Sequence, residues 1–211
     1  MMPKLKDFGL YFITDSTLTR KSVIEDAKSA VKAGVKIIQY REKNAPTRQM
    51  MQEALKIKEI CKSNDVLFLV NDRLDIAIAV DADGVHIGQD DMPYDVARRL
   101  LGNNKIIGVT VHNSEEAIEA EKKGADYLGL SPIFPTSTKK NAGNACGPKM
   151  IVKVRAKASI PVVAIGGIND SNIDEVMRAG ATNVAIISAI ITKNDVTGAA
   201  RFFIEKINHY K

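Results

Sequence analysis

The feature that most constrains the fold is a regular alternation of short apolar runs with longer segments of helical character. Eight runs rich in β-branched residues follow one another along the chain: GLYFIT, VKIIQY, VLFLVN, GVHI, KIIGVT, YLGLS, PVVAI and NVAII. Short runs that are apolar throughout are typical of parallel strands buried on both faces. The alternation therefore predicts a repeated strand–helix unit.

The segments between these runs carry signals for helix starts and helix ends. The starts are marked by the pairs Ser22 with Glu25 and Asn113 with Glu116 and by Pro93, and the ends by Gly34, Gly124 and Gly180. The chain has 211 residues, 45% of them hydrophobic, with neither a composition shift nor a linker. We therefore predict one compact α/β domain over residues 1–211, a (βα)₈ TIM barrel.

Charge and cysteine content narrow the possible partners. The 30 basic and 25 acidic residues give a net charge of +5 without any block of like charges, so we expect no nucleic-acid partner. No apolar run approaches the roughly 18 residues of a membrane span, and we expect no membrane association. Cys61 and Cys146 have no nearby cysteine partner, which favours free thiols and a cytoplasmic location. The chain is compatible with a homo-oligomer.

Polar residues gather directly after the apolar runs, where the active sites of such barrels lie. They are Gln39, Arg41 and Lys43, then Asn71, Asp72 and Arg73, then Asp90 and Asp91, then Thr110 and His112, then Thr136, Thr138 and Lys139, and finally Gly166 and Gly167. Gln39, Arg41 and Lys43 alternate along a strand end, so all three point inward and suit a di- or triphosphate. The alternative is a strand exit with solvated charges.

Two further groups suggest a metal site and a second anion site. Asp72 and Asp91 supply the hard oxygen ligands that Mg²⁺ prefers, although either could instead be a helix cap or a loop carboxylate. Gly166 and Gly167, together with Ser188, occupy the last two loops, where barrels often bind a monophosphate through backbone N–H groups. The sequence therefore predicts two anion sites with a metal ion beside one of them.

The segment 131–148 combines hydroxyl groups, lysines and glycines without apolar periodicity, and we predict that it is a mobile active-site loop. Plain disorder is the alternative. His86 lies within a predicted strand and is expected to be structural. The chain shows no Ser-His-Asp set and no nucleophilic Cys-His pair, so a mechanism without a strong base is favoured.

Five motifs, in order, resemble thiamine phosphate synthase over nearly the whole chain. They are QYREK from Gln39, VNDR from Val70, GVHIGQDD from Gly84, PTSTK from Pro135 and AIGGI from Ala164. The resemblance implies that a hydroxymethylpyrimidine diphosphate condenses with a hydroxyethylthiazole phosphate in a dissociative, Mg²⁺-assisted displacement. The products would be thiamine phosphate and pyrophosphate.

The resemblance also implies a role for individual residues. Arg41, Lys43 and Lys139 would be catalytic and would hold the diphosphate with Asn71; Asp72 and Asp91 would hold Mg²⁺; Gln39 and Thr110 would contact the pyrimidine; Gly167 and Ser188 would bind the thiazole phosphate; and Tyr11, Thr136, Thr138 and Ile187 would be further substrate contacts. Two departures from the family pattern concern Thr110, where serine is usual, and Asn141, where aspartate is frequent. The GNACGP stretch after it is unfamiliar.

Three alternatives remain open. A thiazole tautomerase or regulatory paralogue shares the REK and NDR regions and uses a histidine near the position of His112, but generally lacks Asp91 and the PTSTK segment. A non-catalytic barrel that binds thiamine precursors would leave the diphosphate and metal groups unexplained. Sugar-phosphate epimerases share the glycine site but have no use for a second anion site at Arg41 and Lys43.

Overall fold

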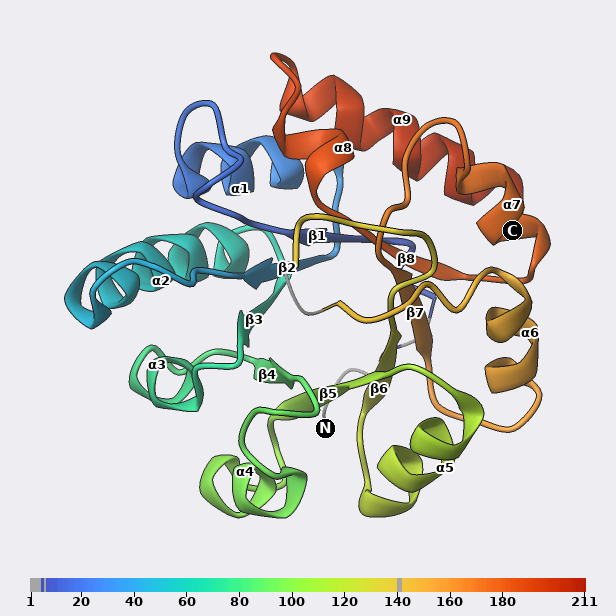
Figure 1. Ribbon diagram of the computed structural model, residues 1–211. Coiled ribbons are helices and arrows are strands. Elements are labelled where there is room, and N and C mark those ends of the chain that lie inside the picture. The colour runs from blue at the N-terminus through green and yellow to red at the C-terminus, as the bar shows by residue number, and fades with distance from the viewer. Residues whose placement is uncertain (1–4, 6, 140–141) are drawn as a thin grey trace.

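The computed structural model describes residues 5, 7–139 and 142–211 and shows a closed barrel of parallel strands in chain order (Figure 1). Strand β8 pairs with β1 and closes the ring. The strands are β1 Leu10–Ile13, β2 Ile37–Tyr40, β3 Leu67–Asn71, β4 Gly84–Ile87, β5 Ile106–Val111, β6 Tyr127–Leu130, β7 Val162–Ile165 and β8 Asn183–Ile186. All eight predicted strands are present, and the predicted TIM barrel is confirmed.

Helices follow every strand and surround the ring (Figure 1). They are α1 Val23–Ala33, α2 Thr47–Lys62, α3 Leu74–Ala79, α4 Tyr94–Leu101, α5 Ser114–Lys123, α6 Lys149–Arg155, α7 Ile173–Arg178, α8 Ser188–Ile191 and α9 Val196–His209. The last crossover is split into α8 and α9, which the sequence had not distinguished. Within the part of the chain that the structure describes, no helix is both long and apolar enough to cross a membrane.

The predicted helix signals work through ordinary capping. The side chain of Ser22 accepts a hydrogen bond from the N–H group of Glu25 at 3.2 Å, and Asn113 caps Glu116 at 2.9 Å in the same way. Gly34 ends α1 with a φ of 100°, a left-handed conformation that a residue with a side chain adopts only at a cost. These caps fix where each strand–helix unit begins and ends.

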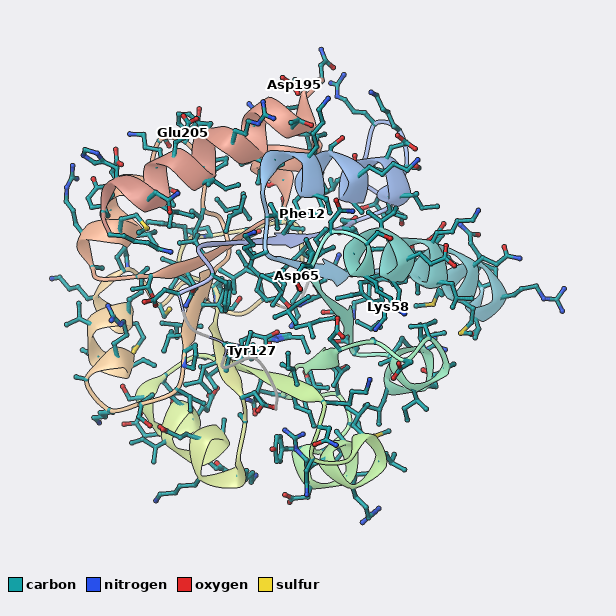
Figure 2. All side chains as sticks on the ribbon, turned by 180° about the vertical axis from the view of Figure 1, so that it is seen from behind. Phe12, Lys58, Asp65, Tyr127, Asp195 and Glu205 are labelled. Carbon is teal, nitrogen blue, oxygen red and sulfur yellow. The ribbon has the colours of Figure 1, made fainter. Side chains whose placement is uncertain are left out.

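Two hydrophobic layers hold the barrel together. The larger one lies between the strands and the helices and includes Phe12, whose burial stabilises the fold by roughly 1.5–3 kcal/mol. The smaller layer fills the inside of the ring and consists of Tyr11, Ile13, Ile37, Leu69, Ile106, Tyr127, Val163 and Ala185. Figure 2 shows Tyr127 near the middle of the ring and Asp195 and Glu205 at its periphery.

The inner layer closes one end of the barrel and leaves the other end open. Leu5 and Phe8, which precede β1, pack against it, and the rings of Phe8 and Tyr11 meet edge to face at 5.9 Å. The amino ends of the strands are therefore covered by apolar side chains. The carboxyl ends, where the sequence placed the polar residues, are therefore the end at which we expect a site.

Candidate active site

A pocket of about 690 Å³, counted up to its open mouth, lies at the carboxyl ends of the strands. The predicted site residues that line it are Tyr11, Gln39, Arg41, Asn71, Thr110, Thr136, Thr138, Lys139 and Ile187. Its other lining residues are Ile13, His86, Tyr127, Gly129, Ser131, Ala142, Val163, Ile165, Gly166 and Ala185. Lys43, Asp72, Asp91, Gly167 and Ser188 lie outside this lining. Most of the predicted residues therefore share one cavity.

Arg41 is held at the pocket wall by an aspartate that the sequence analysis had not singled out. Its guanidinium pairs with Asp15, which follows β1, and the side chains are only 13% and 4% exposed respectively. Asp15 also accepts hydrogen bonds from the N–H group and the hydroxyl of Thr17, at 3.0 and 2.5 Å. The backbone N–H of Arg41 donates to Thr14 Oγ1 at 3.0 Å. The guanidinium is thus positioned before any ligand arrives.

Glu42 lies between the two predicted cations and points away from the pocket. Its buried carboxylate accepts hydrogen bonds from the N–H groups of Asn44 and Ala45 at 2.7 and 3.0 Å. Burial by itself raises the pKa of Glu42, but hydrogen bonds from Ser16 and from backbone N–H groups outweigh it and lower the pKa overall. Glu42 anchors the loop after β2. Gln39 and Arg41 line the pocket whereas Lys43 does not, so an inward direction for all three side chains stays a prediction.

The ends of β3 and β4 bring two carboxylates and two lysines together. Asp72 forms an ion pair with Lys43, whose side chain is 45% exposed. Asp91 accepts a hydrogen bond from the N–H of Gly88 at 2.7 Å. A side chain at position 88 would lie 2.9 Å from Asp91 Oδ2 and 3.7 Å from Lys139 Nζ, so glycine leaves room for both groups. Burial, and then the neighbouring Asp72 carboxyl, raise the pKa of Asp91.

The donor set here fits a hard divalent cation such as Mg²⁺. Asp72 and Asp91 are oxygen donors whose mutual repulsion, seen in the raised pKa of Asp91, a bound cation would relieve. Within residues 5, 7–139 and 142–211, no group of three or more His, Cys, Asp or Glu side chains could hold a metal ion. Two carboxylates would therefore share the ion with substrate phosphates and water, as is usual for Mg²⁺.

The floor of the pocket is a hydrogen-bonded set of neutral side chains. Gln39 donates to the hydroxyl of Tyr11 at 2.8 Å, and that hydroxyl lies 2.9 Å from the hydroxyl of Tyr127. His86 joins Tyr127 through Nδ1 at 2.8 Å and Thr110 through Nε2 at 2.9 Å. Burial, and then the charge of Lys139, lower the pKa of His86 to about 4, so the ring is neutral at pH 7. His86 thus faces the pocket, a position that the sequence analysis did not predict.

The loop after β6 lies over the barrel mouth, where the yellow segment crosses the ring in Figure 1. The N–H groups of Ile133 and Phe134 donate to the carbonyls of Ile165 and Gly166, at 2.9 and 3.0 Å, so the loop extends the pairing of β6 with β7. A side chain on Gly167, whose φ is 66°, would lie 2.8 Å from Phe134 Cβ. The glycines after β7 therefore make room for this loop, in addition to their predicted phosphate role.

Three predicted features stand apart from the pocket wall. Ser188 is exposed and begins α8, one residue after Ile187. His112 pairs through Nδ1 with Glu116 Oε2 at 2.9 Å and is absent from the described lining. Asn141, the departure noted in the loop, lies outside the described residues. The mobility of residues 131–148 remains a prediction.

The fold and the site together define a class of protein: a (βα)₈-barrel enzyme with a cationic rim for an anionic small molecule. The chain matches the sequence model of thiamine monophosphate synthase over residues 10–190. It is 53% identical to the thiamine-phosphate synthase of Methanosarcina barkeri, with 96% of this chain and 92% of that protein aligned. It is 55% identical to the Methanosarcina mazei enzyme, with 98% and 86% aligned.

A solved structure gives the same answer. Thiamine phosphate pyrophosphorylase from Pyrococcus furiosus superposes with a TM-score of 0.87 at 43% identity, covering 95% of this chain and 97% of that one. The chain therefore belongs to the thiamine monophosphate synthase family, as the motifs predicted. It is accordingly a transferase.

Proposed function

We propose that the chain joins a hydroxymethylpyrimidine diphosphate to a hydroxyethylthiazole phosphate and releases pyrophosphate, giving thiamine phosphate. The observation that carries this proposal is the meeting of Lys43, Lys139, Asp72 and Asp91 at the rim of a pocket whose floor is neutral. A charged rim suits a diphosphate, and a neutral floor with donors and acceptors suits a heteroaromatic ring. The names of the aligned relatives support the same activity.

At the rim, Arg41, Lys43, Asn71 and Lys139 would bind the diphosphate, and Asp72 and Asp91 would hold Mg²⁺. The metal ion, when bound, supplies positive charge next to the phosphate oxygens. The Lys43 side chain is 45% exposed and that of Asp72 17%, and an ion pair with a solvent-exposed lysine is worth only about 0–1 kcal/mol. Its ammonium group is therefore free to exchange Asp72 for a phosphate oxygen at little cost.

The bond to the leaving pyrophosphate would break before the new carbon–nitrogen bond forms, and the cations would neutralise the charge that grows on the leaving group. Tyr11, Gln39 and Thr110 would orient the pyrimidine. Gly167, Ile187 and Ser188 would hold the thiazole phosphate, and Thr136 and Thr138 would exclude water from above. A ring nitrogen attacks the cationic carbon, so no strong base is required, in agreement with a neutral His86.

The tautomerase alternative depends on His112 acting as an acid or base. In the structure His112 is paired with Glu116 and is not among the residues that line the described pocket. A group that exchanges protons with a substrate must come within hydrogen-bond reach of it. The position of His112 therefore favours the synthase.

We also propose that the protein works in the reducing cytoplasm, which fits the free thiols of Cys61 and Cys146. A homo-oligomer remains a prediction.

The direct test is to incubate the purified full-length chain with both substrates and Mg²⁺ and to measure pyrophosphate and thiamine phosphate together. We expect equal amounts of the two products, and none when either substrate is omitted or the metal is chelated. Conversion of one thiazole phosphate isomer into another, without pyrophosphate release, would instead identify a tautomerase. Absence of both reactions would leave a binding protein.

A further inference from the structure

A chain of four hydrogen bonds crosses the floor of the pocket from β2 to β5. It runs from Gln39 Nε2 to the hydroxyls of Tyr11 and Tyr127, then to Nδ1 of His86, and from Nε2 of His86 to Oγ1 of Thr110. Every link is between 2.8 and 2.9 Å. The two ends, Gln39 and Thr110, both line the cavity. The chain therefore connects two walls that a ligand would contact at the same time.

Two glycines create the space that this chain occupies. Gly108 is in register with His86 on β4 and with Tyr127 on β6, and a side chain on it would overlap the ring of Tyr127. Gly129 is in register with Thr110, and its side chain would lie 2.8 Å from Cε1 of His86. Glycine weakens a strand interior, so its presence at both positions indicates that other groups need the room. The rings of His86 and Tyr127 stack across the gap at 5.5 Å.

The direction of proton donation along the chain follows from counting protons. Gln39 donates to Tyr11, and an arrangement in which each hydroxyl accepts one bond and donates one carries the proton of Tyr11 to Tyr127 and the proton of Tyr127 to Nδ1 of His86. The proton of the neutral imidazole then lies on Nε2 and is donated to Thr110. Thr110 accepts this bond, and its own hydroxyl proton is left for the pocket. The opposite direction would require a reversed Gln39 amide, or a Tyr11 hydroxyl that accepts from both Gln39 and Tyr127.

We infer that Tyr127 and His86 are positioning residues that make the Thr110 hydroxyl a hydrogen-bond donor toward the ligand. The wall at β5 then selects a heteroaromatic ring that presents an unprotonated nitrogen to Thr110. That the ring is a pyrimidine rests on the proposed function. The direction of the chain rests on Gln39, the hydroxyls of Tyr11 and Tyr127 and the neutral state of His86.

The direction can be measured without any substrate. Nitrogen-15 spectra of the imidazole groups distinguish the two tautomers, and a His86→Gln variant identifies the signals of His86 among the three histidines. We expect the proton on Nε2 in the wild-type protein at neutral pH. Tyr127→Phe should populate both tautomers, whereas Tyr40→Phe, which removes a buried hydroxyl bonded to Glu53 outside the pocket, should change nothing. A wild-type proton on Nδ1 would overturn the inference.

The consequence for the ligand can be tested by binding alone. The probes are the pyrimidine monophosphate, which has no pyrophosphate to lose, two analogues in which one ring nitrogen is replaced by C–H, and one that lacks the amino group. We expect one nitrogen replacement to weaken binding at least about tenfold in the wild type, and about twofold or less in Thr110→Val. Tyr127→Phe should also reduce the difference. If Thr110→Val instead abolishes the effect of removing the amino group, Thr110 is an acceptor and the inference fails.

These outcomes are separate from those of the proposed function. A wild-type protein that releases no pyrophosphate but carries the Nε2 proton would remove the synthase reaction and leave the polarised chain standing. An active enzyme with the proton on Nδ1 would do the opposite. Tyr127→Phe also separates positioning from folding, because a purely structural tyrosine would lower the melting temperature without changing which ring nitrogen is recognised.

Discussion

The floor and the rim of the pocket differ in the charge of their side chains and in exposure to solvent. On the floor, Tyr127 and His86 are neutral and bonded to one another, and their geometry is fixed by the strands that carry them. At the rim, Lys43 and Asp72 form a charged pair in which the lysine side chain is 45% exposed and the aspartate side chain 17%. Buried neutral networks define one pattern of donors and acceptors, whereas exposed ion pairs exchange partners easily. We therefore propose that the floor determines which ring is bound and that the rim provides affinity for phosphate and charge neutralisation.

The largest expected effect is on the rim, at Lys139. Lys139→Met keeps the aliphatic stem and removes the charge that we propose meets the leaving pyrophosphate. We expect kcat/KM to fall by about 10²–10³-fold, the usual loss when one group that stabilises transition-state charge is removed. The melting temperature should stay within about 1 °C, because the side chain is exposed. Lys149→Met, an exposed lysine at the start of α6, is the matched control and should retain full activity.

The second prediction concerns Arg41, whose ion pair with the buried Asp15 links the rim to the interior. Arg41→Gln leaves Asp15 without its cation in a site only 4% exposed, and we expect urea unfolding to show a loss of about 3 kcal/mol along with the loss of activity. Adding Asp15→Asn should restore most of the stability and none of the activity. Lys43→Gln, which breaks an exposed pair, should change stability by about 1 kcal/mol or less. A double variant that regained activity would show that Arg41 serves only to balance Asp15.

We predict that the ionised carboxylate of Asp91 lowers the stability of the fold when no metal ion is bound. Its pKa is raised above the unfolded value, so its stabilising contribution is present at low pH and is lost as the pH rises through the folded-state pKa. Asp91→Asn removes this penalty and keeps an oxygen for the N–H of Gly88. We expect the metal-free variant to melt about 2 °C higher at pH 7, a small gain because Asp91 is partly exposed.

The same variant separates metal binding from capping. Mg²⁺ with pyrophosphate should raise the melting temperature of the wild type and leave that of Asp91→Asn unchanged. Activity should be lost in the variant although the fold is intact. A variant that melts well below the wild type would show that Asp91 is needed as a helix or loop cap, the alternative that the sequence left open.

The fold could be predicted almost completely from the sequence, because each strand and each cap is a local signal. The run GVHI and the pair Ser22 with Glu25 specify their elements without help from distant residues. Ion pairs between residues that are distant in the sequence could not be predicted in this way. Arg41 and Asp15 are 26 positions apart, and their pairing depends on the register of β1 with β2. The motif around Gln39 predicted the cation Arg41 but gave no indication that Asp15 pairs with it.

The floor was the least predictable part. Tyr127 begins the apolar run YLGL, where a core position is the ordinary interpretation, and His86 was expected to be structural. The signal for these two residues lies in Gly108, which is in register with both of them, and in Gly129, where a side chain would meet the ring of His86. A polar residue whose in-register neighbour is glycine, in a strand that should favour larger side chains, is a pattern that could identify such residues from a correctly aligned sheet.

The smallest expected effect lies on the floor, at Thr110. Thr110→Ser keeps the hydroxyl that accepts from His86 and removes one methyl group, so we expect kcat/KM to stay within about threefold and stability to fall by about 1 kcal/mol. Thr110→Val keeps the shape but leaves a nitrogen of His86 unpaired, which should cost about 1–3 kcal/mol and weaken ring binding. If serine and valine were equally damaging, shape would matter at this wall and the hydroxyl would not. If both were harmless, the floor would contribute nothing to ring selection, and recognition would lie entirely with the rim.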